Sequence, residues 1–298
     1  MKPQISFITI NYNSSHYTKE LIKSIQKESS LSYEIIVVDN HSKEEDCKAI
    51  EEFCATQKDV KLIKNEINCG FACGNMTGAK YAQADYLFFI NNDTKLLNDV
   101  SKILKEYLDI DADIALATAS IVDENNHFVS SYKLFPSIIK ELFGNTIARK
   151  VHHYPSNKVR LSEPTAVEVI SGSCMFFKRE AFFEIGGFDT HFFLYCEEED
   201  ISKRILNAGH RVFFIPDAII FHKGGASAQR DYALIQEYYI SYTYLIKKHF
   251  NIFKASTLSL LMLLKLFRRS FKTKYGFKLF IKALQGFNEK ESLRYKNS

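Results

Sequence analysis

The 298-residue chain lacks several signals that define common protein classes. It has no internal repeat and no tryptophan, and no GxGxxG motif follows its first predicted strand, which disfavours a dinucleotide-dependent dehydrogenase. Its cysteines lack the paired CxxC and His spacing of a zinc site, and a chain of this length needs no disulfides. We therefore expect free thiols at Cys47, Cys54, Cys69, Cys73, Cys174 and Cys196.

Signals for export and for membrane spanning are also missing. The opening residues MKPQISFITINYN contain a short apolar run that meets polar residues without a small-residue cleavage site. We therefore expect no signal peptide and a cytoplasmic protein. The apolar stretch over residues 255–267 is shorter than the roughly 20 residues that a spanning helix needs.

Charge is distributed unevenly along the chain. The net charge is +4, but residues 244–298 carry 13 Lys and Arg against 2 Asp and Glu. The acidic remainder disfavours nucleic-acid binding, whereas the basic tail suits a surface of anionic lipid. The apolar stretch in this tail fits two interpretations: a basic amphipathic helix on the inner face of the membrane, or a helix packed on the main domain.

The first 120 residues alternate between β-type apolar runs and helical patterns. Strands buried on both faces and separated by helices predict a doubly wound, mostly parallel sheet, whose ligands lie beyond the carboxyl ends of the strands. The predicted strands cover residues 5–10, 34–38, 60–63, 86–90 and 114–118, and the predicted helices cover 17–26, 44–53, 68–82 and 99–108.

The alternation of strands and helices becomes irregular over residues 123–163. The short aromatic and basic stretches there predict an inserted segment. The alternation becomes regular again with strands at 166–170, 173–178 and 211–215 and helices at 179–185 and 199–208. We place the end of the main domain near residue 240 and treat residues 241–298 as a basic amphipathic helical tail.

Polar residues follow the predicted strands. Asp39 could accept hydrogen bonds from a nucleobase or ribose, although taken by itself a helix N-cap is the favoured explanation. Asp93 follows a hydrophobic strand and could bind a hard divalent cation shared with a diphosphate, whereas the alternative is an ordinary turn residue. His222, with glycines following it, could supply a nitrogen ligand to the same cation.

Four consecutive acids, Glu197 to Asp200, follow an aromatic segment. Carboxylates favour the first turn of a helix, so a solvated helix start is one interpretation. Crowded carboxylates also raise one another's pKa, which would tune one of them as a general base.

Several long motifs in a fixed order carry a resemblance. They are ISFITINYN, EIIVVDNHS, NCGFACGNMTGAKYAQADYLFFINNDT, and SGSCMFFKREAFFEIGGFDTHFFLYCEEEDISKRILNAGHRVFFIPDAIIFHKGGAS. From Ile5 to Ser227 the chain resembles the family 2 glycosyltransferases, and specifically their rhamnosyltransferase-like branch.

The resemblance implies a GT-A (Rossmann-like) fold, with a donor-binding half over residues 1–120 and an acceptor-side half over 121–240. It implies a divalent cation, Mg²⁺ or Mn²⁺, at Asp93 and His222. Donor-binding candidates are Asn11, Tyr12, Asn13, Asp39, Asn68, Gly70, Phe71, Asn75, Asn91, Asn92 and Asp93; acceptor-side candidates are Gly172, Ser173, Asp189 and Tyr195.

The catalytic base implied by the resemblance is Glu198, with Glu197 and Asp200 as the other candidates. Two departures from the family pattern stand out. Many relatives carry Glu-Asp where this chain has Glu197-Glu198, and the cation motif reads Asn-Asn-Asp rather than Asp-x-Asp.

The expected activity is inverting transfer of a sugar from a nucleotide diphosphate donor to a hydroxyl of a glycan or polyprenyl-linked glycan of a bacterial surface. The branch implies dTDP-rhamnose or another deoxyhexose or hexose donor. A nucleotidyltransferase is an alternative, although a basic, glycine-rich phosphate loop is expected after its first strand. A catalytically inactive sugar-nucleotide or glycan-binding module is the second alternative.

Overall fold

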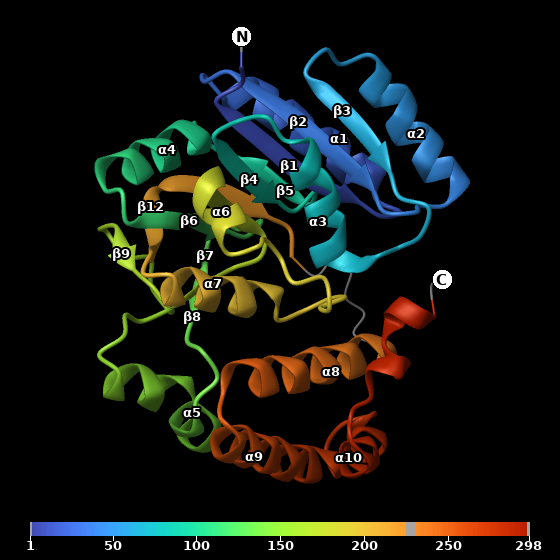
Figure 1. Cartoon of the computed structure of the whole chain (residues 1–298), viewed down its shortest axis with the longest axis vertical. Helices are drawn as coiled ribbons and strands as arrows, with labels where there is room; N and C mark the ends of the chain where they lie inside the picture. Colours follow the sequence, from blue (N-terminus) through green and yellow to red (C-terminus); the bar gives the residue numbers. More distant parts are fainter. Residues whose placement is uncertain (1, 225–230, 297–298) are drawn as a thin grey trace.

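The computed structural model describes residues 2–224 and 231–296, and a ten-stranded sheet forms the centre of this part of the chain (Figure 1). Its main path has the order β3-β2-β1-β4-β11-β6-β12-β5, with β7 paired to β6 and β9 paired to β12. The strands are β1 (Ile5–Asn11), β2 (Tyr33–Asp39), β3 (Val60–Lys64), β4 (Tyr86–Ile90), β5 (Thr94–Leu96), β6 (Ile114–Val122), β7 (Phe128–Val129), β9 (Thr165–Ala166), β11 (Cys174–Lys178) and β12 (Arg211–His222).

The long strands run mostly in one direction. β3, β2, β1 and β4 are parallel neighbours, and β12 is parallel to β6. Between these two groups β11 pairs antiparallel with both β4 and β6. Because β11 is antiparallel to both neighbours, β4 and β6 point the same way, and β12 runs parallel to β6. The carboxyl ends of β4, β6 and β12 therefore lie at one edge of the sheet.

Alternating apolar residues of the sheet face two cores. Phe7 and Phe88 pack with helices α1 (Ser15–Glu28), α2 (Glu44–Ala55) and α4 (Val100–Ile110). Ile8 and Phe89 face the opposite side, where α3 (Gly70–Tyr81), α6 (Arg179–Glu184) and α7 (Glu197–Asn207) lie. The period of two along each strand produces this division.

The C-terminal residues form three helices that join the second core: α8 (Tyr232–His249), α9 (Ile252–Ser270) and α10 (Gly276–Gln285). In Figure 1, α8 lies between α7 and α9. Two short 3₁₀ turns, η1 (Glu289–Glu291) and η2 (Leu293–Tyr295), follow. No helix within residues 2–224 and 231–296 is both long and apolar enough to cross a bilayer.

The predicted α/β fold with its mostly parallel sheet is confirmed, but two segments differ from expectation. The inserted segment contains the strand β8 (Tyr132–Lys133), paired with β10 (Val169–Ile170), and the helix α5 (Ile138–Val151). β12 continues through Pro216 to His222, because register shifts against β6 leave the proline outside the regular ladder. The boundary predicted near residue 240 falls within α8, and the division of the chain stays a prediction.

Candidate active site

The carboxyl ends of β1 and β2 are joined by Asn11, whose side chain is fully buried. Its Nδ2 lies 2.9 Å from Asp39 Oδ1 and 2.8 Å from Asp46 Oδ2, and its Oδ1 accepts a hydrogen bond from Thr18. Asp39 also accepts from the backbone N–H of Ser42 at 3.0 Å, as an N-cap would. Asn11 and Asp39 therefore fix the carboxyl ends of β1 and β2 relative to each other, and Asp39 is almost completely buried.

Asp46 belongs to the same hydrogen-bonded group and was not expected from the sequence. Its carboxylate accepts hydrogen bonds from the backbone N–H groups of Ser14 and Ser15, at the start of α1. Burial acts to raise the pKa of Asp46, but hydrogen bonds from Ser15 and Asn11 outweigh it and lower the pKa. The acid therefore stays ionised within this group. The sequence places Asp46 in the first turn of α2, where an acid needs no functional explanation.

The loop before α3 is held by Asn40, a second residue that sequence reasoning missed. Its Nδ2 donates to Asn68 Oδ1 at 2.9 Å and to the carbonyl of Gly70 at 3.1 Å. Gly70 has φ +83°, and a Cβ there would lie 2.2 Å from the carbonyl oxygen of Phe193. Only glycine fits this close approach, which the hydrogen bond from Phe71 N to Phe193 O (2.7 Å) maintains.

The cation candidates Asp93 and His222 are brought together by the pairing of β5 with β12, in which Thr94 opposes His222. His222 Nε2 lies 3.1 Å from Asp93 Oδ1, and both side chains are only partly exposed. Asn92 turns away and donates to Ser14 and Thr18 of α1. The sheet edge thus presents one carboxylate and one imidazole side by side.

This pair fits a hard divalent cation, because carboxylate oxygen and imidazole nitrogen are both ligands that Mn²⁺ accepts, while Mg²⁺ favours the oxygen. No group of three or more His, Cys, Asp or Glu side chains among the described residues is arranged to hold a metal ion. Gly225, the second glycine of the motif after His222, lies outside the described residues.

The acid run begins α7, immediately after Tyr195 and Cys196, which both have positive φ. Lys133 of β8 reaches this turn, with its Nζ 2.5 Å from Glu198 Oε1 and 2.8 Å from Glu199 Oε1. Burial and the charge of Glu199 raise the pKa of Glu198, although Lys133 opposes them. Burial and the neighbouring Glu198 raise the pKa of Glu197 well above its usual range. The crowding predicted from the sequence is present, and Lys133 is the partner that the sequence did not reveal.

The acid cluster and the end of β4 meet through residues 172 and 173. A Cβ at Gly172 would lie 3.9 Å from the side chain of Glu198. The next residue, Ser173, accepts a hydrogen bond from Asn91 N at 3.1 Å through its backbone carbonyl. The segment that carries Asp93 and the helix that carries Glu198 therefore border the same part of the molecule.

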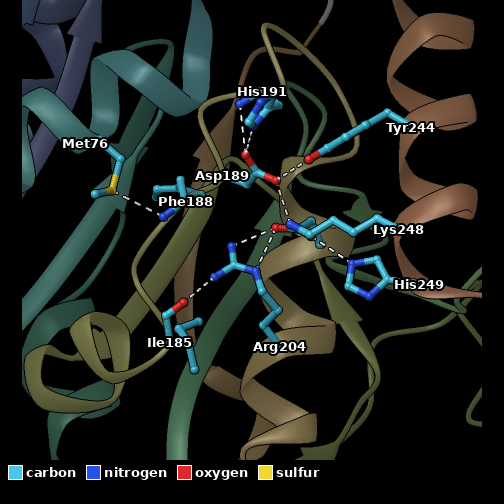
Figure 2. Close-up of polar contacts among 10 residues, drawn as sticks. Met76, Ile185, Phe188, Asp189, His191, Arg204, Tyr244, Lys248 and His249 are labelled. Carbon is cyan, nitrogen blue, oxygen red and sulfur yellow. Dashed lines mark hydrogen bonds and ion pairs between the residues drawn. The ribbon is translucent and has the colours of Figure 1, made fainter.

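Asp200 belongs to a charged network with Arg204, Lys248 and His249, which Figure 2 labels. Arg204 donates to its Oδ2 at 2.9 and 2.7 Å, and its Oδ1 lies 2.6 Å from Lys248 Nζ and 2.7 Å from His249 Nε2. Burial acts to raise its pKa, but His249, Arg204 and Lys248 lower it. Both carboxylate oxygens of this fully buried acid are committed to α7 and α8.

Asp189 occupies the same network. Its Oδ1 accepts from the backbone N–H of His191, and its Oδ2 accepts from Tyr244 and Lys248 at 2.9 and 2.6 Å (Figure 2). Burial acts to raise its pKa, but these hydrogen bonds, led by the one from Lys248, lower it. Asp189 therefore anchors the loop before α7 to α8.

The remaining predicted residues differ in their surroundings. Asn13 Oδ1 accepts from Lys43 N, which fixes the loop after β1, and Tyr12 beside it is 45% exposed. Asn75 lies within α3 and donates to the carbonyl of Phe71. Tyr195 packs edge-on against Tyr238 of α8, with ring centroids 6.0 Å apart.

With this geometry in view, comparisons with known proteins define the class. The fold is that of GT-A glycosyltransferases: a mannosyltransferase from Pyrobaculum calidifontis, solved with GDP-Man and Mn²⁺, superposes with a TM-score of 0.59 at 17% identity, covering 96% of this chain and 80% of that one. GalNAc-T7, solved with UDP, GalNAc and Mn²⁺, superposes with a TM-score of 0.60 at 18% identity over 80% of this chain and 47% of its own.

Residues 6–186 match the family described as Glycosyl transferase family 2, and the chain belongs to this family. It is 22% identical to the rhamnosyltransferase WbbL of Escherichia coli K12, over 71% of this chain and 80% of that protein. It is 34% identical to an N-acetylglucosaminyl-diphospho-decaprenol L-rhamnosyltransferase of Mycobacterium tuberculosis over 88 residues, which are 29% of each chain. The chain thus belongs to glycosyltransferase family 2 and has rhamnosyltransferases among its relatives.

Proposed function

We propose that this glycosyltransferase inverts the configuration at the anomeric carbon while it moves a deoxyhexose or hexose from a nucleotide diphosphate. Rhamnose is the sugar that the names of two relatives give, and dTDP-rhamnose is the donor that we propose for it. The proposal rests above all on one arrangement: Asp93 and His222 are 3.1 Å apart at the sheet edge. The nearby Asn91 donates to the carbonyl of Ser173, whose neighbour Gly172 adjoins Glu198.

In this proposal Glu198 is the base. Its carboxylate takes the proton of the acceptor hydroxyl as that oxygen bonds to the anomeric carbon, and the bond from that carbon to the diphosphate oxygen breaks with its electron pair. Lys133 keeps Glu198 oriented and ionised through the contact at 2.5 Å. The pKa of Glu198 is raised by burial and by Glu199, which makes its carboxylate a stronger base than an exposed one.

Asp93 and His222 would hold the divalent cation. Bound there, Mg²⁺ or Mn²⁺ would neutralise charge on the departing diphosphate. We assign the nucleoside to the region beyond the carboxyl ends of β1 and β2, which Asn11, Asp39 and Asp46 hold together, and to the loop at Gly70. We assign the acceptor to the side of Gly172, whose Cβ position adjoins Glu198.

For the acceptor we propose a hydroxyl of a glycan carried on a polyprenyl diphosphate, the class that the name of the mycobacterial relative gives for that enzyme. Such an acceptor is anchored in lipid. We therefore place the protein at the inner face of the cell membrane.

The decisive experiment offers a panel of nucleotide sugars with Mn²⁺ or Mg²⁺ to the purified chain and a lipid-linked acceptor, and assigns the anomeric configuration of the product by NMR. We expect turnover with one deoxyhexose or hexose donor and a product of inverted configuration. Retention would refute the single displacement. Donor binding without turnover on any acceptor would favour the inactive binding module, and release of pyrophosphate from a nucleoside triphosphate would favour the nucleotidyltransferase.

A further inference from the structure

The helix α9 carries two apolar stripes rather than one. Its inner stripe, Ala255, Leu258, Met262 and Leu266, is buried against the core. The opposite stripe recurs at spacings of three, four and seven residues and is exposed; it consists of Phe253 (82% exposed), Leu260, Leu264, Phe267 and Phe271 (77%). The inner stripe alone accounts for the packing of α9, so the outer stripe needs a separate explanation.

The neighbouring helices continue this outer stripe. α10 contacts α9 and exposes Phe277, Ile281 and Leu284 at helical spacing, while Phe280 packs on Phe267. More than half of the large apolar side chains that are exposed in the described residues lie on α5, α9, α10 and the turn between α9 and α10. So large an apolar surface marks an interaction site.

α5 completes the surface from the acceptor side. It contacts α9, and an ion pair joins Glu141 of α5 to Lys265 of α9. The residues after Glu141, Leu142 and Phe143, are 55% and 60% exposed. In Figure 1, α5, α9 and α10 lie along the edge of the molecule away from the large sheet.

The charge of this surface identifies its partner. Residues 252–285 contain eight Lys and Arg and no Asp or Glu. Among them, Arg268 and Lys272 are exposed beside Phe267 and Phe271. A second copy of the chain would bring this positive surface against itself, whereas an anionic bilayer offers both acyl chains and negative headgroups.

We propose that the outer faces of α5, α9 and α10, here called the outer apolar face, insert together into the interface of an anionic lipid bilayer. The inference deepens the proposed function. It rests on that function for one point only, which is the reason why the protein would contact a membrane. α5 follows β8, whose Lys133 binds Glu198, so a bilayer on this face lies a short segment of chain from the acid cluster. A lipid-linked acceptor would then reach Glu198 while its anchor stays in the membrane.

Sedimentation of the purified chain with lipid vesicles tests the inference without donor or acceptor, so its outcome is independent of the proposed activity. The chain should bind vesicles of phosphatidylcholine mixed with phosphatidylglycerol. It should bind vesicles of phosphatidylcholine alone much more weakly. The triple variant Phe253→Ser/Phe271→Ser/Phe277→Ser should bind about 1,000-fold more weakly, because each of the three apolar rings buried in lipid contributes roughly a factor of ten. The double variant Arg268→Gln/Lys272→Gln should lose about 30-fold on the anionic vesicles alone.

Matched controls change residues of similar exposure on other faces: Ile67→Ser/Ile110→Ser/Val159→Ser and Lys48→Gln/Lys102→Gln. They should bind vesicles as the natural chain does, and an unchanged melting temperature shows that the variants are folded. Equal loss in the controls, or no vesicle binding by the natural chain, would overturn the proposal. A dimer that the triple Phe variant converts to a monomer, without vesicle binding, would instead assign the face to a second copy.

Discussion

Glu198 and Asp200 look alike in sequence and both lie in the first turn of α7, but their surroundings differ. Glu198 forms an ion pair with Lys133, while burial and Glu199 raise its pKa. Asp200, two residues later, faces α8, contacts three cationic or hydrogen-bonding side chains, and has a lowered pKa. The difference teaches that the surroundings of each acid, and not the acidic run, separate a base from an anchor.

Removal of the base should have the largest effect on turnover. Glu198→Gln keeps the shape of the side chain but cannot accept the proton, so kcat should fall by about 10²–10⁴-fold while donor affinity changes little. The matched control is Glu199→Gln, which also loses a contact with Lys133 but should reduce kcat by less than about tenfold. Steady-state kinetics and donor titration check both, and equal losses in the two variants would remove the distinction.

Asp200→Asn should lower stability rather than turnover. It leaves Arg204, Lys248 and His249 facing a neutral group in a fully buried site, which costs about 3–5 kcal/mol of unfolding free energy. Urea unfolding measures the loss. A variant with normal stability and no turnover would move the role of base to Asp200.

Two features of the molecule could be predicted from the sequence: the parallel core, and the proximity of Asp93 to His222. The alternation of strands and helices specified the parallel core, because buried strands have a compositional signature of their own. The order of strand-end residues brought Asp93 and His222 into consideration, and they lie 3.1 Å apart.

Other parts of the site could not be read from the chain alone. Lys133 and Asn40 act through contacts made across long sequence separations, and neither stands in a distinctive pattern. α5 lies in a segment whose helix is interrupted at Gly144, with φ +81°, so its periodicity is broken. The double stripe of α9 looks like one apolar run in sequence, and only packing reveals that half of it stays outside.

His222→Ala tests the proposed cation site at Asp93 and His222. It removes the nitrogen beside Asp93, so the Mn²⁺ concentration needed for half-maximal activity should rise by at least about tenfold. His222→Gln, which keeps a neutral polar group, should have a smaller effect. An unchanged Mn²⁺ dependence would place the cation elsewhere.

Lys133→Met should shift the pH dependence of turnover. Lys133 lowers the pKa of Glu198, so without it the base stays protonated to higher pH and the acidic limb of the kcat profile moves upward. A profile recorded against that of the natural chain checks the direction. A shift to lower pH would contradict the assignment of Lys133 to Glu198.

Asp189 and Asp200, which hold α8, should control the stability of the folded chain at low pH, and this effect should be the smallest of the series. Asp189 and Asp200 have lowered pKa values in the folded chain, so the stability that they contribute is complete above about pH 4 and is lost as pH falls through their folded values. Asp189→Asn should therefore flatten the dependence of melting temperature on pH at the acid end. A slope equal to that of the natural chain would show that Asp189 contributes nothing.

The most direct test of the account is a crystal structure of the Glu198→Gln variant with a nucleotide-sugar donor and Mn²⁺. We predict that Asp93 and His222 bind the ion at roughly 2.0–2.2 Å together with diphosphate oxygens, and that the sugar lies between this ion and residue 198. An acceptor oxygen near residue 198 should then fall about 3–3.5 Å from the anomeric carbon. An ion bound away from Asp93, or a sugar on the far side of the sheet edge from residue 198, would contradict the account.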